Sequence, residues 1–248
     1  MNLAIDVGNS SAKAALFEGN TLKEYINRLD KVLLMDLLAQ ETINNIIVSS
    51  VNPVSEEILA AIPDAIKILK LNYQLPLPIR HLYQTPATLG MDRVAAAVGA
   101  TFLFPFANRL VIDAGTCITY DFVDKENTYR GGSISLGLQM RFRALHEFTA
   151  KLPLFSKESY HKGMSFIGNS TETSMASGVI NGIKSEIEGF IRLYAQEFGN
   201  LEVIFCGGDA EFLMELFNAN SIQQAHLTHQ KEVLLIGLNH ILQYNLKQ

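Results

Sequence analysis

The sequence NLAIDVGNSSAKAALF at residues 2–17 returns in altered form as RLVIDAGTCITYDFV at residues 109–123, and this repeat decides the fold. Each copy has an apolar run, then Ile-Asp, a small residue and glycine, and then a second run of strand-forming residues. Such an order is typical of two β-strands joined by a tight turn. The shared core is IDVG at residues 5–8 and IDAG at residues 112–115, so each predicted hairpin carries an aspartate where its first strand ends.

The segments after each hairpin also correspond. After the first hairpin, the apolar spacing predicts strands over residues 21–27, 45–51 and 66–71 and helices over residues 31–40 and 55–62. After the second hairpin, it predicts strands over residues 129–134 and 201–206 and helices over residues 138–150, 171–198, 210–217 and 233–246. Strands that alternate with helices indicate α/β domains. We therefore predict two α/β domains of one ancestry, at residues 1–108 and 109–248.

Composition narrows the classes of function. The net charge is −5 and the 20 Lys and Arg residues do not cluster, which argues against a nucleic-acid partner. The two cysteines, Cys117 and Cys206, form no disulfide framework, and the six histidines show no metal-binding spacing. The first residues lack the pattern of a signal peptide, and the longest uncharged apolar stretch, residues 94–107, is too short to span a bilayer. We expect a cytoplasmic protein with no membrane partner.

The two acidic turns suit nucleotide phosphates. Glycine lets the backbone approach and point N–H groups at anionic oxygens, whereas an aspartate needs a cation or water between itself and phosphate. A single Asp-x-Gly is more typical of an ordinary tight hairpin turn. Two copies in matching halves favour two phosphate-binding turns. A third element, FCGGDA at residues 205–210, would let an adenosine lie against paired glycines. Alone it favours an ordinary strand-to-helix turn with Asp209 as N-cap, but after two phosphate motifs we favour the adenosine contact.

These three elements resemble the phosphate-1, phosphate-2 and adenosine motifs of the sugar kinase, heat-shock chaperone and actin superfamily. Within it, nearly the whole chain is similar to the type III pantothenate kinases. The matching blocks are DVGNS (6–10), SSVNP (49–53), YQTPATLGMDR (83–93), DAGT (113–116), GGSI (131–134), TAKLP (149–153) and GNST (168–171). Three positions depart from the family pattern: Ser10 replaces Thr, Cys117 replaces Ala, and Leu136 replaces the Pro before Gly137. The last departure leaves the path of that loop open.

The resemblance implies two RNase H-like domains with ATP in the cleft between them. It implies transfer of the γ-phosphoryl group of ATP to the primary hydroxyl of pantothenate, which gives 4'-phosphopantothenate in the first step of coenzyme A biosynthesis. It also implies Mg²⁺, a monovalent cation (K⁺ or NH₄⁺), and a homodimer whose pantothenate pocket is completed across the subunit interface.

The resemblance also assigns residues. The residues expected to bind ATP are Asp6, Val7, Gly8, Asn9, Ser10, Ser11, Ala12, Lys13 and Thr116. The residues expected at the pantothenate site are Tyr83, Gly90, Met91, Asp92, Arg93 and Thr171. Asp6 would bind Mg²⁺ through water and Asp113 would bind the monovalent cation; the residues alone do not distinguish these two aspartates.

Asp92 is the candidate catalytic base. From its spacing alone, a base and a cap of the helix that follows are equally good interpretations, and the resemblance favours the base. By the same resemblance Arg93 would hold the pantothenate carboxylate, against the alternative of a surface ion pair. The plain alternatives are core packing for Tyr83, a helix N-cap for Thr171 and solvent exposure for Lys13.

Two rival functions remain at this stage. Another kinase or an exopolyphosphatase-type hydrolase of the superfamily would share the phosphate motifs but lack the block at residues 83–93. A nucleotide-binding transcriptional regulator is the rival that is not an enzyme, and the negative net charge argues against it.

Overall fold

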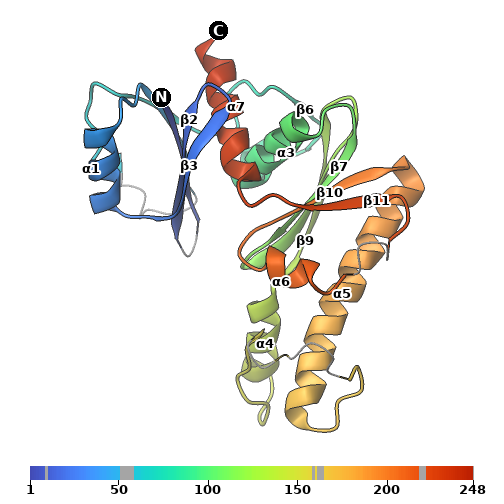
Figure 1. Cartoon of the computed structure of the whole chain (residues 1–248). Coiled ribbons are helices and arrows are strands. Elements are labelled where there is room, and N and C mark those ends of the chain that lie inside the picture. Colours follow the sequence, from blue (N-terminus) through green and yellow to red (C-terminus); the bar gives the residue numbers. More distant parts are fainter. Residues whose placement is uncertain (9–10, 51–58, 158–159, 161–164, 218–221, 248) are drawn as a thin grey trace. The chain divides into compact units, whose positions relative to one another are not determined.

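The computed structural model describes residues 1–8, 11–50, 59–157, 160, 165–217 and 222–247. Within them the strands form two sheets (Figure 1). The first has the order β3-β2-β1-β4-β5. Its strands are β1 (Asn2–Val7), β2 (Ala12–Glu18), β3 (Thr21–Leu29), β4 (Asn45–Ser50) and β5 (Lys67–Lys70). β2 pairs antiparallel with both β1 and β3, whereas β4 pairs parallel with both β1 and β5.

The second sheet repeats this order. It runs β11-β10-β7-β8-β9-β6. Its strands are β6 (Arg80–His81), β7 (Asn108–Ala114), β8 (Cys117–Val123), β9 (Thr128–Leu136), β10 (Leu201–Cys206) and β11 (Ala225–His229). From β9 to β11 the order matches that from β3 to β5, and β10 again pairs parallel with the first hairpin strand, β7, and with β11. The predicted repeat of the two hairpins is therefore confirmed by their place in the two sheets.

The helices agree largely with the periodicity of the sequence. They are α1 (Lys31–Gln40), η1 (Pro86–Thr88), α3 (Met91–Leu103), α4 (Leu138–Glu147), α5 (Thr171–Phe198), α6 (Ala210–Met214) and α7 (Val233–Leu246). The predicted bounds of α1, α5, α7 and β10 are confirmed. Most of the helix predicted over residues 55–62 lies outside the described residues, and β6 and β11 were not predicted.

Two predicted helices end early, and local hydrogen bonds explain why. The helix predicted over residues 138–150 ends at Glu147, where the Thr149 hydroxyl bonds the carbonyl of Leu145 at 2.7 Å. That carbonyl is the acceptor that a continuing helix would offer to the Thr149 N–H, and a threonine side chain competes for it. The helix predicted over residues 210–217 gives way after Met214 to turns, in which the Phe217 N–H bonds the carbonyl three residues earlier.

Contacts divide the chain into two compact units. Unit 1 comprises residues 1–107, 122–131 and 231–248, and unit 2 comprises residues 108–121 and 132–230. β8 and β9 therefore each contribute residues to both units. The division into two related domains at residues 108 and 109 concerns ancestry and stays a prediction.

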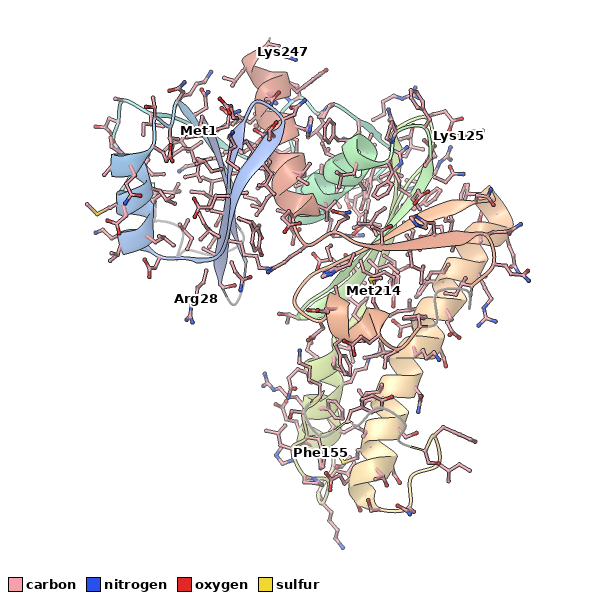
Figure 2. The ribbon with its side chains drawn as sticks, in the orientation of Figure 1. Met1, Arg28, Lys125, Phe155, Met214 and Lys247 are labelled. Carbon is pink, nitrogen blue, oxygen red and sulfur yellow. The ribbon has the colours of Figure 1, made fainter. Side chains whose placement is uncertain are left out.

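Unit 1 has a core on each face of its sheet. Successive residues of β1 alternate between these cores, because side chains of a strand point to opposite faces: Leu3 and Ile5 pack with Leu34 of α1, and Ala4 packs with α3 and α7. The side chains that fill this second core are drawn in Figure 2. In unit 2, Ile183, Ile187 and Ile191 recur every four residues along α5 and are fully buried. No helix in the described ranges is long and apolar enough to cross a membrane.

Candidate functional site

The first acidic turn lies in unit 1, at the end of β1. Asp6 is directly opposite Lys13 on β2 and Ser49 on β4. Because opposite residues of paired strands project from the same face, Lys13 and Asp6 lie on the same face of the sheet. The Gly8 N–H donates to the Ser11 carbonyl at 3.1 Å and closes the turn. The predicted contacts of Asn9 and Ser10 lie outside the described residues.

The block at residues 83–93 leads into α3, also in unit 1. Gly90 is the N-cap of this helix, and Asp92 lies in its first turn. Asp92 Oδ1 accepts the N–H of Arg93 at 2.9 Å, which satisfies one of the unpaired donors at a helix start. Asp92 therefore does bind the helix terminus, and its second oxygen, Oδ2, lies outside that hydrogen bond. Both interpretations of Asp92 fit this geometry.

Arg93 is buried, with 8% of its surface exposed. Its Cζ lies 6.0 Å from the centre of the Tyr83 ring, which is within the range of cation–π attraction. This burial removes the alternative in which Arg93 forms a surface ion pair. An arginine taken out of water is suited to an anionic group that binds it in two places.

The second acidic turn and the paired glycines meet in unit 2. A Cβ on Gly207, whose φ is +90°, would lie 2.4 Å from Asp113 Oδ1 and 2.5 Å from the Ala114 carbonyl oxygen. Only glycine allows this approach, and the register of β10 with β7 places Cys206 opposite Asp113. The structure thus brings the second acidic turn and the paired-glycine loop together.

Asp209 precedes α6 but does not cap it through its side chain. Its backbone N–H donates to the Ala114 carbonyl at 2.9 Å, and its carboxylate pairs with Lys157 Nζ at 2.5 Å. The N-cap alternative is confirmed in position, because Asp209 is the N-cap residue of α6, but its side chain makes no capping hydrogen bond. Asp209 instead joins the paired-glycine loop to the second turn and to the segment that carries Lys157.

Gly137 completes the second turn and was not predicted to touch it. It is the N-cap of α4, and its N–H donates to the Thr116 carbonyl at 3.1 Å. A Cβ at this glycine would lie 2.2 Å from that oxygen. The expected loop before Gly137 is absent from this described part of the chain, because β9 runs through Leu136 and α4 begins at Leu138. Gly137 holds this junction of strand and helix against the second turn.

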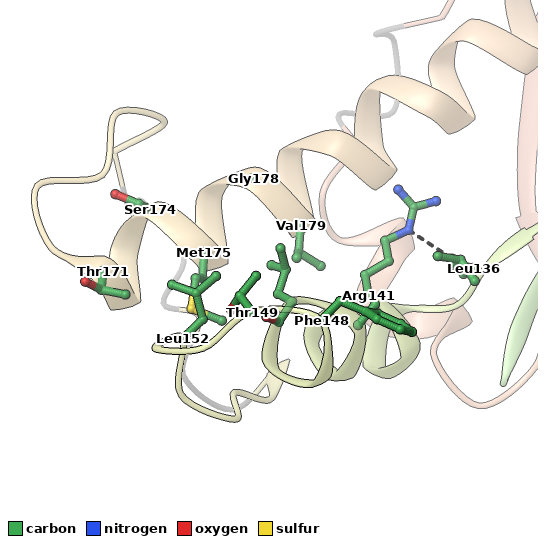
Figure 3. A pocket seen from close by; sticks show the side chains of 12 residues that line it. Leu136, Arg141, Phe148, Thr149, Leu152, Thr171, Ser174, Met175, Gly178 and Val179 are labelled. Atoms are coloured by element: carbon green, nitrogen blue, oxygen red, sulfur yellow. Dashed lines mark hydrogen bonds between the residues drawn. The ribbon is translucent and has the colours of Figure 1, made fainter.

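Thr171 lies in unit 2, at the first position of α5. The N-cap of α5 is Ser170, which forms a capping box with Thr173, so the alternative that made Thr171 the cap is wrong. Thr171 instead lines a cavity of about 960 Å³ between α4 and α5 (Figure 3). The remaining lining residues are Leu136, Arg141, Ala144, Leu145, Phe148, Thr149, Leu152, Ser174, Met175, Gly178 and Val179.

A polar network holds the wall of this cavity and has no signal in the sequence. Arg141 Nη2 pairs with Glu186 Oε2 at 2.6 Å and donates to the Ser135 hydroxyl at 3.0 Å. The Tyr120 hydroxyl donates to Glu186 Oε1 at 2.8 Å. Burial raises the pKa of Glu186, but the hydrogen bonds from Arg141 and Tyr120 outweigh it and leave the pKa below its usual range. The network therefore stabilises a charged Glu186 that ties α4, α5 and β9 together.

The carboxylates suit hard cations bound mainly by phosphate and water. Within the described residues, no three His, Cys, Asp or Glu side chains form a group that could hold a metal ion. Mg²⁺ in phosphate-transfer sites usually keeps several waters and uses one or two carboxylates together with substrate phosphates. A single Asp6 at the first acidic turn fits that requirement, and Asp113 with the nearby Ala114 carbonyl has oxygens of the kind a monovalent cation takes.

The predicted residues are divided between the two units, and the residues expected at the pantothenate site fall in both. Unit 1 contains Asp6, Val7, Gly8, Ser11, Ala12, Lys13, Tyr83, Gly90, Met91, Asp92 and Arg93. Unit 2 contains Asp113, Thr116 and Thr171.

Comparison with known proteins identifies the family that this chain resembles. The family model described as type III pantothenate kinase matches residues 2–193. The type III pantothenate kinase of Flavobacterium johnsoniae is 44% identical over 217 residues, which cover 86% of this chain and 88% of the relative.

Comparison with solved structures identifies proteins of similar fold. A conserved putative Baf family transcriptional activator from Campylobacter jejuni has a TM-score of 0.62 at 22% identity and covers 99% of this chain and 100% of its own. Ta0583, an archaeal actin homolog, has a TM-score of 0.52 at 11% identity and covers 98% of this chain and 99% of its own. At these identities the likeness concerns the fold alone, which is the predicted pair of RNase H-like α/β domains.

Proposed function

The chain belongs to the type III pantothenate kinase family, and from this premise we propose that it transfers the γ-phosphoryl group of ATP to the primary hydroxyl of pantothenate, with Asp92 as the base. The product is 4'-phosphopantothenate, the first intermediate on the way to coenzyme A. The observation that carries the proposal is the start of α3, where the Asp92 carboxylate is fixed by one oxygen beside the buried Arg93.

Asp92 orients the attacking hydroxyl and accepts its proton. Phosphoryl transfer proceeds through a loose transition state, so the base acts mainly by positioning the nucleophile and takes the proton late. The hydrogen bond from the Arg93 N–H to Oδ1 fixes the direction of the carboxylate. Oδ2 is then the oxygen that receives the hydroxyl proton.

Arg93 binds the carboxylate of pantothenate. A guanidinium forms two parallel hydrogen bonds with a carboxylate and so sets the direction of the substrate as well as its charge. Tyr83, Gly90, Met91 and Thr171 line the pantothenate site in the family resemblance. The position of Thr171 on the wall of a cavity supports its part in this assignment.

Residues 6–13 and Thr116 hold the phosphates of ATP. The backbone N–H groups of the two turns and the Lys13 ammonium are the donors, and kinases of this family use ATP with a divalent cation. Asp6 would hold Mg²⁺ through bound water, and this ion neutralises the charge of the β- and γ-phosphates when it is bound. Asp113 would hold K⁺ or NH₄⁺ beside the second turn.

The apolar cavity wall supports a homodimer. Phe148, directly after α4, is 85% exposed. Large apolar side chains are also exposed on β9 (Ile134 and Leu136) and between α4 and α5 (Leu154, Phe166 and Ile167). Of these, Leu136 and Phe148 line the same cavity. Monomers rarely expose several large apolar side chains together, and a two-fold interface would bury the same surface of both copies. Replacing Phe148 with glutamate should convert dimers to monomers in sedimentation. The matched change at Phe106, a phenylalanine in unit 1 that is 90% exposed, should leave the dimer intact.

A coupled assay tests the function itself. Pantothenate, ATP and Mg²⁺ should give ADP and 4'-phosphopantothenate, and omission of K⁺ and NH₄⁺ should lower the rate. Asp92→Asn should retain ATP binding and lose nearly all turnover, whereas Asp36→Asn, an exposed aspartate on α1, should behave as the wild type. Wild-type turnover in Asp92→Asn would remove Asp92 from the reaction. DNA binding in a gel-shift assay without any turnover would instead support the regulator.

A further inference from the structure

Tyr83 lies on the backbone of β9 because the chain before it runs along that strand. β6 pairs parallel with β9, with His81 opposite Tyr129. The N–H of Leu82 then donates to the carbonyl of Tyr129 at 2.9 Å. Continued by two residues from His81 and Tyr129, this register brings Tyr83 to Gly131, where an added Cβ would lie 3.6 Å and 3.8 Å from the ring atoms Cδ2 and Cε2.

The ring of Tyr83 is held by two neighbours. Gly131 has a φ of +104°, a conformation that other residues rarely adopt, and it presents no side chain to the ring. Tyr129 is fully buried, and its ring centre lies 6.3 Å from that of Tyr83 at an interplanar angle of 30°. Tyr83 is therefore fixed in orientation by residues from a strand far away in sequence.

The turn between β8 and β9 makes this support rigid. Asp124 Oδ1 accepts the N–H groups of Glu126 at 3.1 Å and Thr128 at 2.8 Å. Asp124 Oδ2 accepts Arg130 Nε at 2.7 Å. A buried carboxylate with several donors locks the turn, and with it the strand residues beneath the Tyr83 ring.

The Tyr83 ring lies next to the guanidinium of Arg93, at 6.0 Å from ring centre to Cζ. A buried cation gains from the negative face of an aromatic ring, more so when water is excluded. A guanidinium that must meet a carboxylate along two bonds needs a fixed plane as well as a charge.

We propose that Tyr83 is a positioning residue, whose ring, seated on Gly131 and Tyr129, orients the Arg93 guanidinium toward the carboxylate of pantothenate. This inference rests on the proposed function, in which Arg93 binds that carboxylate. It makes the ring of Tyr83, and not its hydroxyl, the group that selects a substrate with an acidic end.

Binding of two ligands to the full-length enzyme tests the proposal. Pantothenate has the carboxylate, and pantothenol has a hydroxymethyl group in its place. By calorimetry, Tyr83→Leu should raise the dissociation constant of pantothenate by about fivefold and change that of pantothenol by less than about twofold. Tyr83→Phe, which keeps the ring, should recover most of the lost affinity. Tyr73→Leu, a change at an exposed tyrosine of the same unit, should have no effect.

Two results would overturn the proposal. Equal losses in Tyr83→Phe and Tyr83→Leu would assign the role to the hydroxyl, and equal losses for both ligands would assign a purely structural role. Gly131→Ala strains the backbone under the ring, because its φ is +104°, and leaves Tyr83 itself unchanged. It should repeat the selective loss and keeps the test valid if Tyr83→Leu does not fold. Absence of pantothenate turnover in the wild type would refute the proposed function itself, so the two failures are distinguishable.

Discussion

Replacing Gly99 with alanine tests how closely α3, which carries Asp92, depends on α7. In unit 1 these two helices meet backbone to backbone. A Cβ on Gly99 would lie 1.9 Å from the Val233 carbonyl oxygen and 3.0 Å from the Gly237 nitrogen. A Cβ on Gly237 would lie 1.7 Å from the carbonyl oxygen of Ala95. Neither helix can take even one methyl group at this crossing.

The cost follows from these distances. Ordinary van der Waals contact begins at about 3.4 Å, so the helices would have to separate by roughly 1.5 Å. Alanine favours a helix over glycine by about 1 kcal/mol, but overpacking costs about 1–3 kcal/mol and more when the obstacle is backbone. We expect the free energy of unfolding of unit 1 to fall by about 2 kcal/mol, which lowers its Tm by about 6 °C. Because a shift of about 1 Å at the chemistry can cost about 100-fold, kcat should fall as well.

Urea denaturation and a thermal melt followed by circular dichroism measure this loss. Gly189→Ala is the matched control, because Gly189 lies in the middle of α5 and nothing is within 4 Å of an added Cβ. That control should gain up to about 1 kcal/mol from helix propensity. If Gly99→Ala proves as stable as Gly189→Ala, the close crossing of α3 and α7 is refuted.

The remaining predictions concern three titratable side chains, of which Asp124 is buried and Glu186 and His240 are partly buried. Burial raises the pKa of Asp124, but its hydrogen bonds outweigh this and lower the pKa below its usual range, so its stabilisation is present at pH 7 and is lost as the pH falls below about 4. Asp124→Asn should therefore lower the free energy of unfolding by about 1–3 kcal/mol at pH 7 in urea titrations, and a difference that persists unchanged at pH 3 would contradict this. Glu186→Gln leaves Arg141 without its ion pair and should cost unit 2 about 1–3 kcal/mol in the same titration; an unchanged midpoint would count against the network. Burial lowers the pKa of His240, so the wild type should lose stability as the pH falls from about 7 to 5. In thermal melts, His240→Phe should show a smaller change of Tm with pH over this range. An equal change in both proteins would refute the prediction.

Much of the fold could be predicted from the sequence because its signals are local. The paired Ile-Asp-x-Gly runs predicted both hairpins, and the spacing of apolar residues predicted the observed bounds of α1, α5 and α7. β11 was missed because its sequence, AHLTH, is a polar edge strand with no apolar run. β6 was missed because two residues are too short to show a period.

The candidate site likewise contains residues that could be predicted from the sequence and residues that could not. The block at residues 83–93 and the two acidic turns stand out in the sequence because their residue types are unusual and closely spaced. The residues that support them do not: Gly131 and Tyr129 lie more than 30 positions from Arg93, and nothing near them in the chain marks the contact. Such contacts depend on strand order and register, which local patterns leave open.

By itself the sequence determined the repeat, most of the strands and helices, the acidic turns and the membership of a kinase family, because each depends on the identity and spacing of neighbouring residues. Only the tertiary structure decided which distant groups meet: Gly207 against Asp113, Gly137 against Thr116, and α7 against α3. The physical reason is that these approaches are set by sheet register and helix packing, where a few tenths of an ångström decide whether a glycine is required.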